Sequence, residues 1–185
     1  KTVITSLIWK LLERFGTQGI QFIVTIIIAR LLMPEDYGII ALITVFIVLA
    51  NVFIKSGIGS ALIQKKDADE VDFSSIFYLS LAIAVFLYIV LFFCAPLISD
   101  FYQLPLLVPV LRILALTLIF GALNSIQNAY VSKNMLFKKL FFSSTGAIIV
   151  SGTLGILAAY KGLGVWALVA QQLSSQITIT VILWF

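Results

Sequence analysis

Long apolar runs divide this sequence, and they constrain its fold more than any other feature. A helix needs about 20 apolar residues to cross a bilayer. The runs also lack the strict alternation of apolar and polar residues that marks a strand of a membrane β-barrel. The sequence therefore predicts an all-α integral membrane protein with about six transmembrane helices. We expect these helices near residues 6–32, 37–54, 74–98, 106–131, 140–160 and 165–185.

The composition narrows the chemistry that such a chain supports. Of its 185 residues, 62% are hydrophobic and 11% are charged, whereas about 25% of the residues in a soluble domain are charged. The chain has no histidine and a single cysteine, Cys94. These counts exclude an internal disulfide, a zinc site of histidine and cysteine, and any catalytic dyad or triad that uses imidazole. We expect no cofactor, no metal and no enzymatic activity.

The basic residues predict how the chain is oriented. The formal net charge is +4, but the basic residues lie between apolar runs, as in the lysine-rich cytoplasmic loops of membrane proteins. We therefore expect no nucleic-acid partner. If the N-terminus is cytoplasmic, the opposite turns hold little more than Arg30 and Lys161, and the sequence predicts that orientation. The segments then placed in the cytoplasm carry Lys1, Lys10, Arg14, Lys55, Lys65, Lys66, Lys133, Lys138 and Lys139.

The first run carries a polar stripe, which is the strongest candidate for a binding surface. Its residues recur at three- and four-residue spacing and so share one face of a helix. Two interpretations stay open. The stripe could line a cationic cavity that receives an anionic group of a substrate. Alternatively, Glu13 and Arg14 could pair or reach the cytoplasmic interface, while the amides bond neighbouring helices. The stripe consists of Arg14, Thr17, Gln18, Gln21 and Thr25.

Polar residues on the later runs have both a packing and a binding interpretation. Asn51 on the second run, Asn124 on the fourth and Gln171 on the sixth are further cavity candidates, although amides also hold helices together in hydrocarbon. On the fourth run Arg112 lies on a different face from Asn124, and we expect it to extend toward the outer surface. The fifth run carries a row of small residues, which predicts close helix packing. The row is Ser144, Ala147, Ser151, Gly155 and Ala158.

Three segments resemble a known family. Residues 9–16 (WKLLERFG), followed by Gln18 and Gln21, and residues 29–38 (ARLLMPEDYG) resemble the start of bacterial polysaccharide exporters. Residues 56–64 (SGIGSALIQ) look like the glycine-rich inner loop of the same proteins. The family is the oligosaccharide flippase branch of the multidrug/oligosaccharidyl-lipid/polysaccharide exporter superfamily, which includes Wzx-type and colanic acid exporters.

The resemblance implies a two-lobed transporter of about twelve or more helices, with residues 1–185 as its N-terminal six-helix lobe. It implies a flippase that moves oligosaccharide repeat units, linked to undecaprenyl pyrophosphate, across the bacterial inner membrane for O-antigen, capsule or exopolysaccharide synthesis. The partners that it implies are this substrate, membrane lipids, a C-terminal lobe of the same protein and polysaccharide assembly proteins. By position, Arg14 matches a cavity arginine, with Glu13, Gln18 and Gln21 beside it, and Arg30 is carried over as structural.

Three other functions stay open at this point. A multidrug or small-molecule exporter of the same superfamily would usually carry more acidic cavity residues than Glu13 alone. A membrane-embedded glycan-assembly enzyme would need clustered acids or histidines at one membrane edge, and the acids of this chain are scattered over its turns. A subunit of an assembly complex that does not transport is the third.

Overall fold

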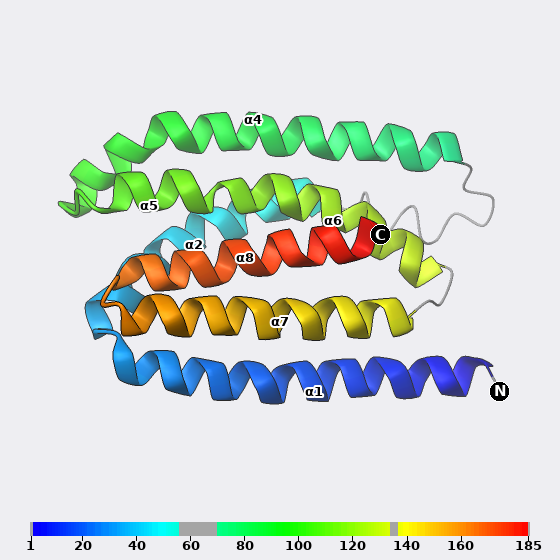
Figure 1. Cartoon of the computed structure of the whole chain (residues 1–185). Coiled ribbons are helices and arrows are strands. Elements are labelled where there is room, and N and C mark those ends of the chain that lie inside the picture. The colour runs from blue at the N-terminus through cyan, green and yellow to red at the C-terminus, as the bar shows by residue number, and fades with distance from the viewer. Residues whose placement is uncertain (1, 56–69, 134–136, 185) are drawn as a thin grey trace. The chain divides into compact units, whose positions relative to one another are not determined.

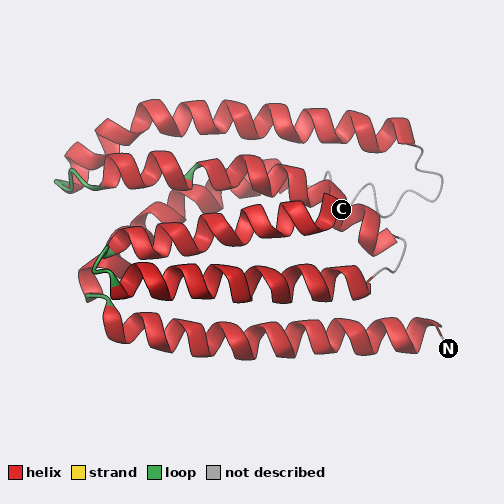
Figure 2. Ribbon diagram, viewed as in Figure 1, coloured by secondary structure: helices red, strands yellow, loops and turns green. Residues whose placement is uncertain are grey.

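The computed structural model describes residues 2–55, 70–133 and 137–184, and within these ranges every regular element is a helix (Figure 2). The fold class predicted from the apolar runs is therefore confirmed. The glycine-rich segment 56–64 lies outside the described residues. The helices are α1 (Thr2–Leu31), α2 (Pro34–Lys55), α4 (Glu70–Tyr102), α5 (Leu107–Leu114), α6 (Leu116–Lys133), α7 (Phe137–Tyr160) and α8 (Val165–Trp184).

Five segments of the described chain are long and apolar enough to cross a membrane. They correspond to the second to sixth predicted runs. Helix α1 is not among them, although its 30 residues extend about 45 Å at 1.5 Å per residue. The six-pass lobe over residues 1–185 therefore stays a prediction. The five segments are Pro34–Ile54, Ser74–Tyr102, Leu107–Val131, Lys139–Tyr160 and Val165–Trp184.

The chain forms two compact units, and their boundary falls inside α6. Unit 1 contains Lys1–Met33 and Gln127–Phe185, and unit 2 contains Pro34–Ile126. In unit 1, α7 packs against both α1 and α8, so that the three helices lie side by side (Figure 1). The row of small residues predicted on the fifth run lies on α7, where Ala147, Ser151 and Gly155 are buried. This confirms its assignment to helix packing.

Unit 2 is held together by a core of small and branched apolar side chains. Helix α4 packs against α5 and α2, and the beginning of α6 contributes to the same cluster. Small residues such as Ala84 and Ala115, both fully buried, let the helices approach closely. The buried members of this core are Ala50, Ile54, Ala84, Leu91, Ala115, Leu118 and Ala122.

The third and fourth predicted runs end or break differently in the structure. The third run was expected to end at residue 98, but α4 continues through Pro96 to Tyr102. The fourth run was expected as one helix, but it is broken at Ala115 into α5 and α6. At this break the Thr117 hydroxyl donates a hydrogen bond to the Leu114 carbonyl, so a side chain bonds a backbone group next to the interruption.

Pro34 begins α2, the first helix of unit 2. Pro34 lies in the first turn of α2, where no intrahelical N–H is required, and the helix begins three residues earlier than predicted. Glu35 and Asp36 follow in the same turn, where carboxylates interact favourably with the positive end of the helix dipole.

Candidate functional site

The polar stripe predicted on the first run lies on α1 and is largely open. Arg14, Gln18 and Thr25 are exposed, and Thr17 and Gln21 are half-buried. The Thr17 hydroxyl donates to the Arg14 carbonyl at 3.3 Å, so it bonds its own helix. The side chain of Glu13 lies outside the described residues. The stripe thus presents a guanidinium and a carboxamide, those of Arg14 and Gln18, on an accessible helix surface.

The contact between α1 and α7 includes part of the face that carries the stripe. The buried side chains of α1 are Val24 and Ile28, which lie against two glycines of α7. A Cβ atom added to Gly152 would lie 2.8 Å from Cγ2 of Val24, and one added to Gly155 would lie 3.1 Å from Cδ1 of Ile28. Val24 and Ile28 continue the row of Thr17 and Gln21 at helical spacing, so the half-buried side of the stripe faces α7. Arg14 and the other exposed residues of the stripe lie beside this contact.

Gln171 belongs to a different contact in unit 1. It is half-buried on α8, and its Cβ would lie 3.0 Å from a Cβ added to Gly155. One glycine of α7 thus accommodates Ile28 of α1 and Gln171 of α8. Because α7 lies between α1 and α8 (Figure 1), the described structure supports a packing role for Gln171 and does not bring it to the stripe of Arg14.

The two predicted asparagines lie in unit 2, Asn51 on α2 and Asn124 on α6. The Asn51 side-chain amide donates to the Ile47 carbonyl at 3.0 Å, and its Oδ1 would lie 3.6 Å from a Cβ added to Gly121. Asn124, one turn further along α6, is 5% exposed. Asn51 therefore lies where α2 meets α6, and Asn124 is buried.

Arg112 does not extend toward the surface as we expected. Its Nε donates to the backbone carbonyl of Phe92 at 3.3 Å, and its Cζ lies 4.1 Å from the centre of the Phe92 ring. Phe92 lies ten residues before the end of α4 at Tyr102, about 15 Å along the helix. The guanidinium is therefore turned inward, to a backbone group and an aromatic face that sequence spacing does not reveal.

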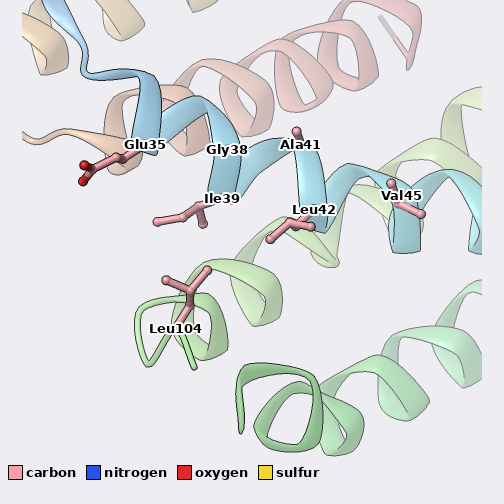
Figure 3. Close-up of a pocket in the computed structure, with 7 residues that line it drawn as sticks. All are labelled: Glu35, Gly38, Ile39, Ala41, Leu42, Val45 and Leu104. Atoms are coloured by element: carbon pink, nitrogen blue, oxygen red, sulfur yellow. The ribbon is translucent and has the colours of Figure 1, made fainter. Parts of the chain in front are cut away.

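The sequence also did not reveal an apolar groove in unit 2. Its volume is about 630 Å³, and it lies between the first turns of α2 and Leu104 in the turn before α5 (Figure 3). Glu35 is its one acidic residue. The groove has space because two small residues, Gly38 and Ala41, lie three positions apart on α2. Their spacing is the one sequence feature that could have predicted it. The lining residues are Glu35, Gly38, Ile39, Ala41, Leu42, Val45 and Leu104.

Within the described ranges, no group of three or more histidine, cysteine or acidic side chains gathers where it could hold a metal ion. The candidate site is the stripe on α1, and its chemistry is that of one guanidinium with neutral hydrogen-bonding neighbours. Arginine presents a planar fork of donors that matches the oxygens of phosphate groups. A partner with phosphate or carboxylate oxygens suits this surface best.

Comparison with known proteins gives consistent relatives. The chain is 28% identical to the succinoglycan biosynthesis transport protein ExoT of Rhizobium meliloti (strain 1021) over 92% of its own length and 35% of the relative's. It is 21% identical to the lipopolysaccharide biosynthesis protein WzxC of Escherichia coli (strain K12) over 82% of its length and 31% of that protein's. It is 35% identical to the teichuronic acid biosynthesis protein TuaB of Bacillus subtilis (strain 168) over 55% and 20% of the two chains.

The chain thus spans about a third of the length of the first two of these relatives. No solved structure matches it. The family model described as "Polysaccharide biosynthesis protein" matches residues 27–185, a range that includes the resemblance at residues 29–38 but not the one at residues 9–16. Because this match covers well over half of the chain, we conclude that this multi-pass membrane protein belongs to the polysaccharide biosynthesis protein family.

Proposed function

We propose that this chain forms the N-terminal helices of a flippase that moves oligosaccharide repeat units linked to undecaprenyl pyrophosphate across the bacterial inner membrane. The product would be built into a surface polysaccharide. Two relatives support the class of cargo, because their names refer to succinoglycan transport and lipopolysaccharide biosynthesis. Its expected partners are membrane lipids, a C-terminal lobe and polysaccharide assembly proteins.

The open stripe on α1 is the observation that carries this proposal. A pyrophosphate needs positive charge and hydrogen-bond donors when it leaves water, and Arg14 supplies both on an exposed helix face. Gln18 and Gln21 follow at helical spacing and add neutral donors and acceptors suited to sugar hydroxyls. In this proposal, binding and translocation involve no covalent step, so the protein is a transporter and not an enzyme.

The proposed orientation places the N-terminus in the cytoplasm. Arg14 then lies in the inner half of α1, on the side from which a newly made repeat unit arrives. Asn51, Asn124 and Gln171 have a secondary place in this proposal, because Asn51 and Gln171 lie at contacts between helices and Asn124 is buried. Glu13 precedes Arg14 directly in the sequence, and we propose that its carboxylate lowers the net positive charge beside the bound pyrophosphate.

Complementation tests the proposal with a matched control. The full-length protein is expressed in a strain that lacks its own repeat-unit exporter, and surface polysaccharide is measured together with membrane abundance. We expect the unaltered protein to restore the polysaccharide and Arg14→Ala to lower this restoration about tenfold or more, the effect of losing one charge-assisted hydrogen bond. Arg30→Ala is the control, because Arg30 is also an exposed arginine of α1 but lies off the stripe.

The outcomes separate the function from the site. If the unaltered protein fails while lipid-linked repeat units accumulate, the flippase proposal is wrong for that substrate. If Arg14→Ala and Arg30→Ala restore equal amounts of polysaccharide, the flippase proposal stands and the assignment of Arg14 is wrong. Arg14→Lys should fall between the two, because lysine keeps the charge but loses the planar fork of donors.

A further inference from the structure

Pro96 creates a specific defect in the backbone of α4. In an α-helix the N–H of each residue donates to the carbonyl four residues earlier. Proline has no N–H, and its ring also crowds that carbonyl. Pro96 lies inside α4, so the carbonyl of Phe92 receives no hydrogen bond from position 96. In a membrane an unsatisfied carbonyl is costly, and a helix containing proline needs a donor from elsewhere.

Arg112 supplies such a donor from the neighbouring helix. Its Nε donates to this same Phe92 carbonyl at 3.3 Å, and its Cζ lies 4.1 Å from the centre of the Phe92 ring. The guanidinium thus gains a backbone acceptor and an aromatic face from one residue. Both interactions are stronger when water is excluded. Arg112 is half-buried. These two interactions therefore hold its guanidinium against α4, among apolar side chains.

The chain between Phe92 and Arg112 is also hydrogen-bonded at the turn that joins α4 to α5. α4 ends at Tyr102, and the Ser99 hydroxyl donates to the Leu104 carbonyl at 2.9 Å. The Leu104 N–H donates back to the Ser99 carbonyl at 3.1 Å. The last turns of α4, the turn and α5 therefore form a hairpin that is bonded at its tip and, through Arg112, at its base.

We propose that Pro96 is a hinge and that Arg112 is its latch. The hairpin Pro96–Leu114 bends as one body relative to the rest of α4, and the Arg112 bond to Phe92 fixes the angle. When the latch opens, the Phe92 carbonyl and the backbone around it become accessible. Arg112 acts as a positioning residue, and the device does not depend on the substrate proposed above.

A double-mutant cycle tests this pairing because Pro96→Ala restores the missing N–H. With alanine at position 96 the helix satisfies the Phe92 carbonyl by itself, and Arg112 is no longer needed there. The reporter is Cys94, the single cysteine of the sequence, which lies two residues from both Phe92 and Pro96 along the chain. Its side chain is half-buried. Its alkylation rate is measured by mass spectrometry of the peptide that contains it, on the full protein in lipid nanodiscs.

Arg112→Met should raise the Cys94 alkylation rate about tenfold in the Pro96 background, the effect expected when a charge-assisted hydrogen bond no longer opposes local opening. The same change should leave the rate within about twofold in the Pro96→Ala background. Arg112→Lys should give an intermediate rate, because it keeps the charge without the Nε donor. Arg30→Met is the matched control, and we expect no change in either background.

Equal effects of Arg112→Met in both backgrounds would overturn the proposal, because Arg112 would then act independently of Pro96. The folded yield gives a second readout if Arg112→Met alone does not accumulate. Recovery of folded protein in the Pro96→Ala and Arg112→Met double variant supports the latch. Failure of the double variant to fold contradicts it, since the restored N–H would have removed the need for Arg112.

Discussion

Two glycines of α7 determine how closely its neighbours approach in unit 1. A Cβ at Gly152 would lie 2.8 Å from Val24, closer than real Cβ contacts allow. Valine is branched at Cβ, so its side chain has few other rotamers that would relieve this contact. The sequence predicted close packing along this helix from the small residues, but it did not identify Val24 as the partner. Helical periodicity gives the face of a residue, and only the packed structure gives its neighbour.

Gly152→Ala should therefore lower the free energy of unfolding by about 1–3 kcal/mol, the usual cost of overpacking. Val24→Ala in the same protein should recover most of this loss, because it removes the two methyl groups that the new Cβ meets. The measurement is the apparent free energy of unfolding in mixed detergent micelles.

Gly19→Ala is the control, since a Cβ at Gly19 on α1 meets nothing within 4 Å. Alanine favours helix over glycine by about 1 kcal/mol, so this variant should be neutral or slightly more stable. A loss in Gly152→Ala that Val24→Ala fails to reduce would show that the contact between these two side chains is not the cause.

The stripe on α1 shows which structural features can be predicted from residue spacing alone. The spacing of Arg14, Gln18 and Thr25 predicted one polar face, and these residues are exposed on α1. Arg112 was expected to extend to the outer surface because it lies near the end of its run, but its guanidinium bonds the Phe92 carbonyl instead. Its partner is a backbone carbonyl that Pro96 leaves without a helical donor, and no pattern of side chains encodes that partner. Predictions from the sequence thus held for residues on one helix and failed for a contact between two.

At the scale of helices, α4 and α7 end in the same kind of turn. After α4, Gln103 has φ of 54°, the Leu104 N–H bonds the Ser99 carbonyl and the Gln103 N–H bonds the Asp100 carbonyl. After α7, Gly162 has φ of 71°, and the equivalent bonds run from Leu163 to Ala158 and from Gly162 to Ala159. Both are Schellman ends, but only one has the glycine that this left-handed conformation favours.

Opposite substitutions at these two positions should have opposite effects. Gln103→Gly should raise the free energy of unfolding by about 1 kcal/mol, because a side chain in the left-handed region costs about 1–2 kcal/mol. Gly162→Ala should lower it by a similar amount. Gly38→Ala is the control, because Gly38 has no positive φ and its Cβ would meet open space. Changes of the same sign at Gln103 and Gly162 would contradict this assignment of the turns.

Prolines show why the sequence predicted the existence of helices better than their limits. Pro34 begins α2, in agreement with the preference of proline for a first helical turn. Pro96 has the same chemistry, yet α4 continues six residues beyond it. At Pro96 the carbonyl left without a helical donor accepts a hydrogen bond from Arg112 on the next helix, which the local sequence around Pro96 does not contain. Breaks such as that at Ala115 are hidden in the same way, because an apolar run of uniform composition carries no mark of an interruption.

For the whole molecule, the described chain has five segments that suit a membrane, and α1 is not one of them. The proposed function nevertheless requires α1 to cross the membrane, because the polar stripe must line the path that the substrate takes through it. The length of α1, 30 residues, is sufficient for a bilayer about 30 Å thick.

Single cysteines test this crossing and the orientation together. In a Cys94→Ala background, Thr2→Cys, Glu35→Cys and Lys139→Cys are treated with a membrane-impermeant maleimide, first in intact spheroplasts and then after permeabilisation. If α1 crosses with its N-terminus inside, Glu35→Cys reacts in intact spheroplasts, and the other two react only after permeabilisation. Three segments that suit a membrane separate Glu35 from Lys139, so this pair must lie on opposite sides in either orientation.

Thr2→Cys is the decisive position. If it reacts together with Glu35→Cys in intact spheroplasts, α1 lies on one side of the membrane, and Arg14 has no path along which to guide a pyrophosphate. If Thr2→Cys and Lys139→Cys both react from outside while Glu35→Cys is protected, α1 crosses but the orientation is reversed. The excess of lysine and arginine on the segments assigned to the cytoplasm opposes that reversal, and Arg14 would then lie in the half of the membrane that a repeat unit leaves last.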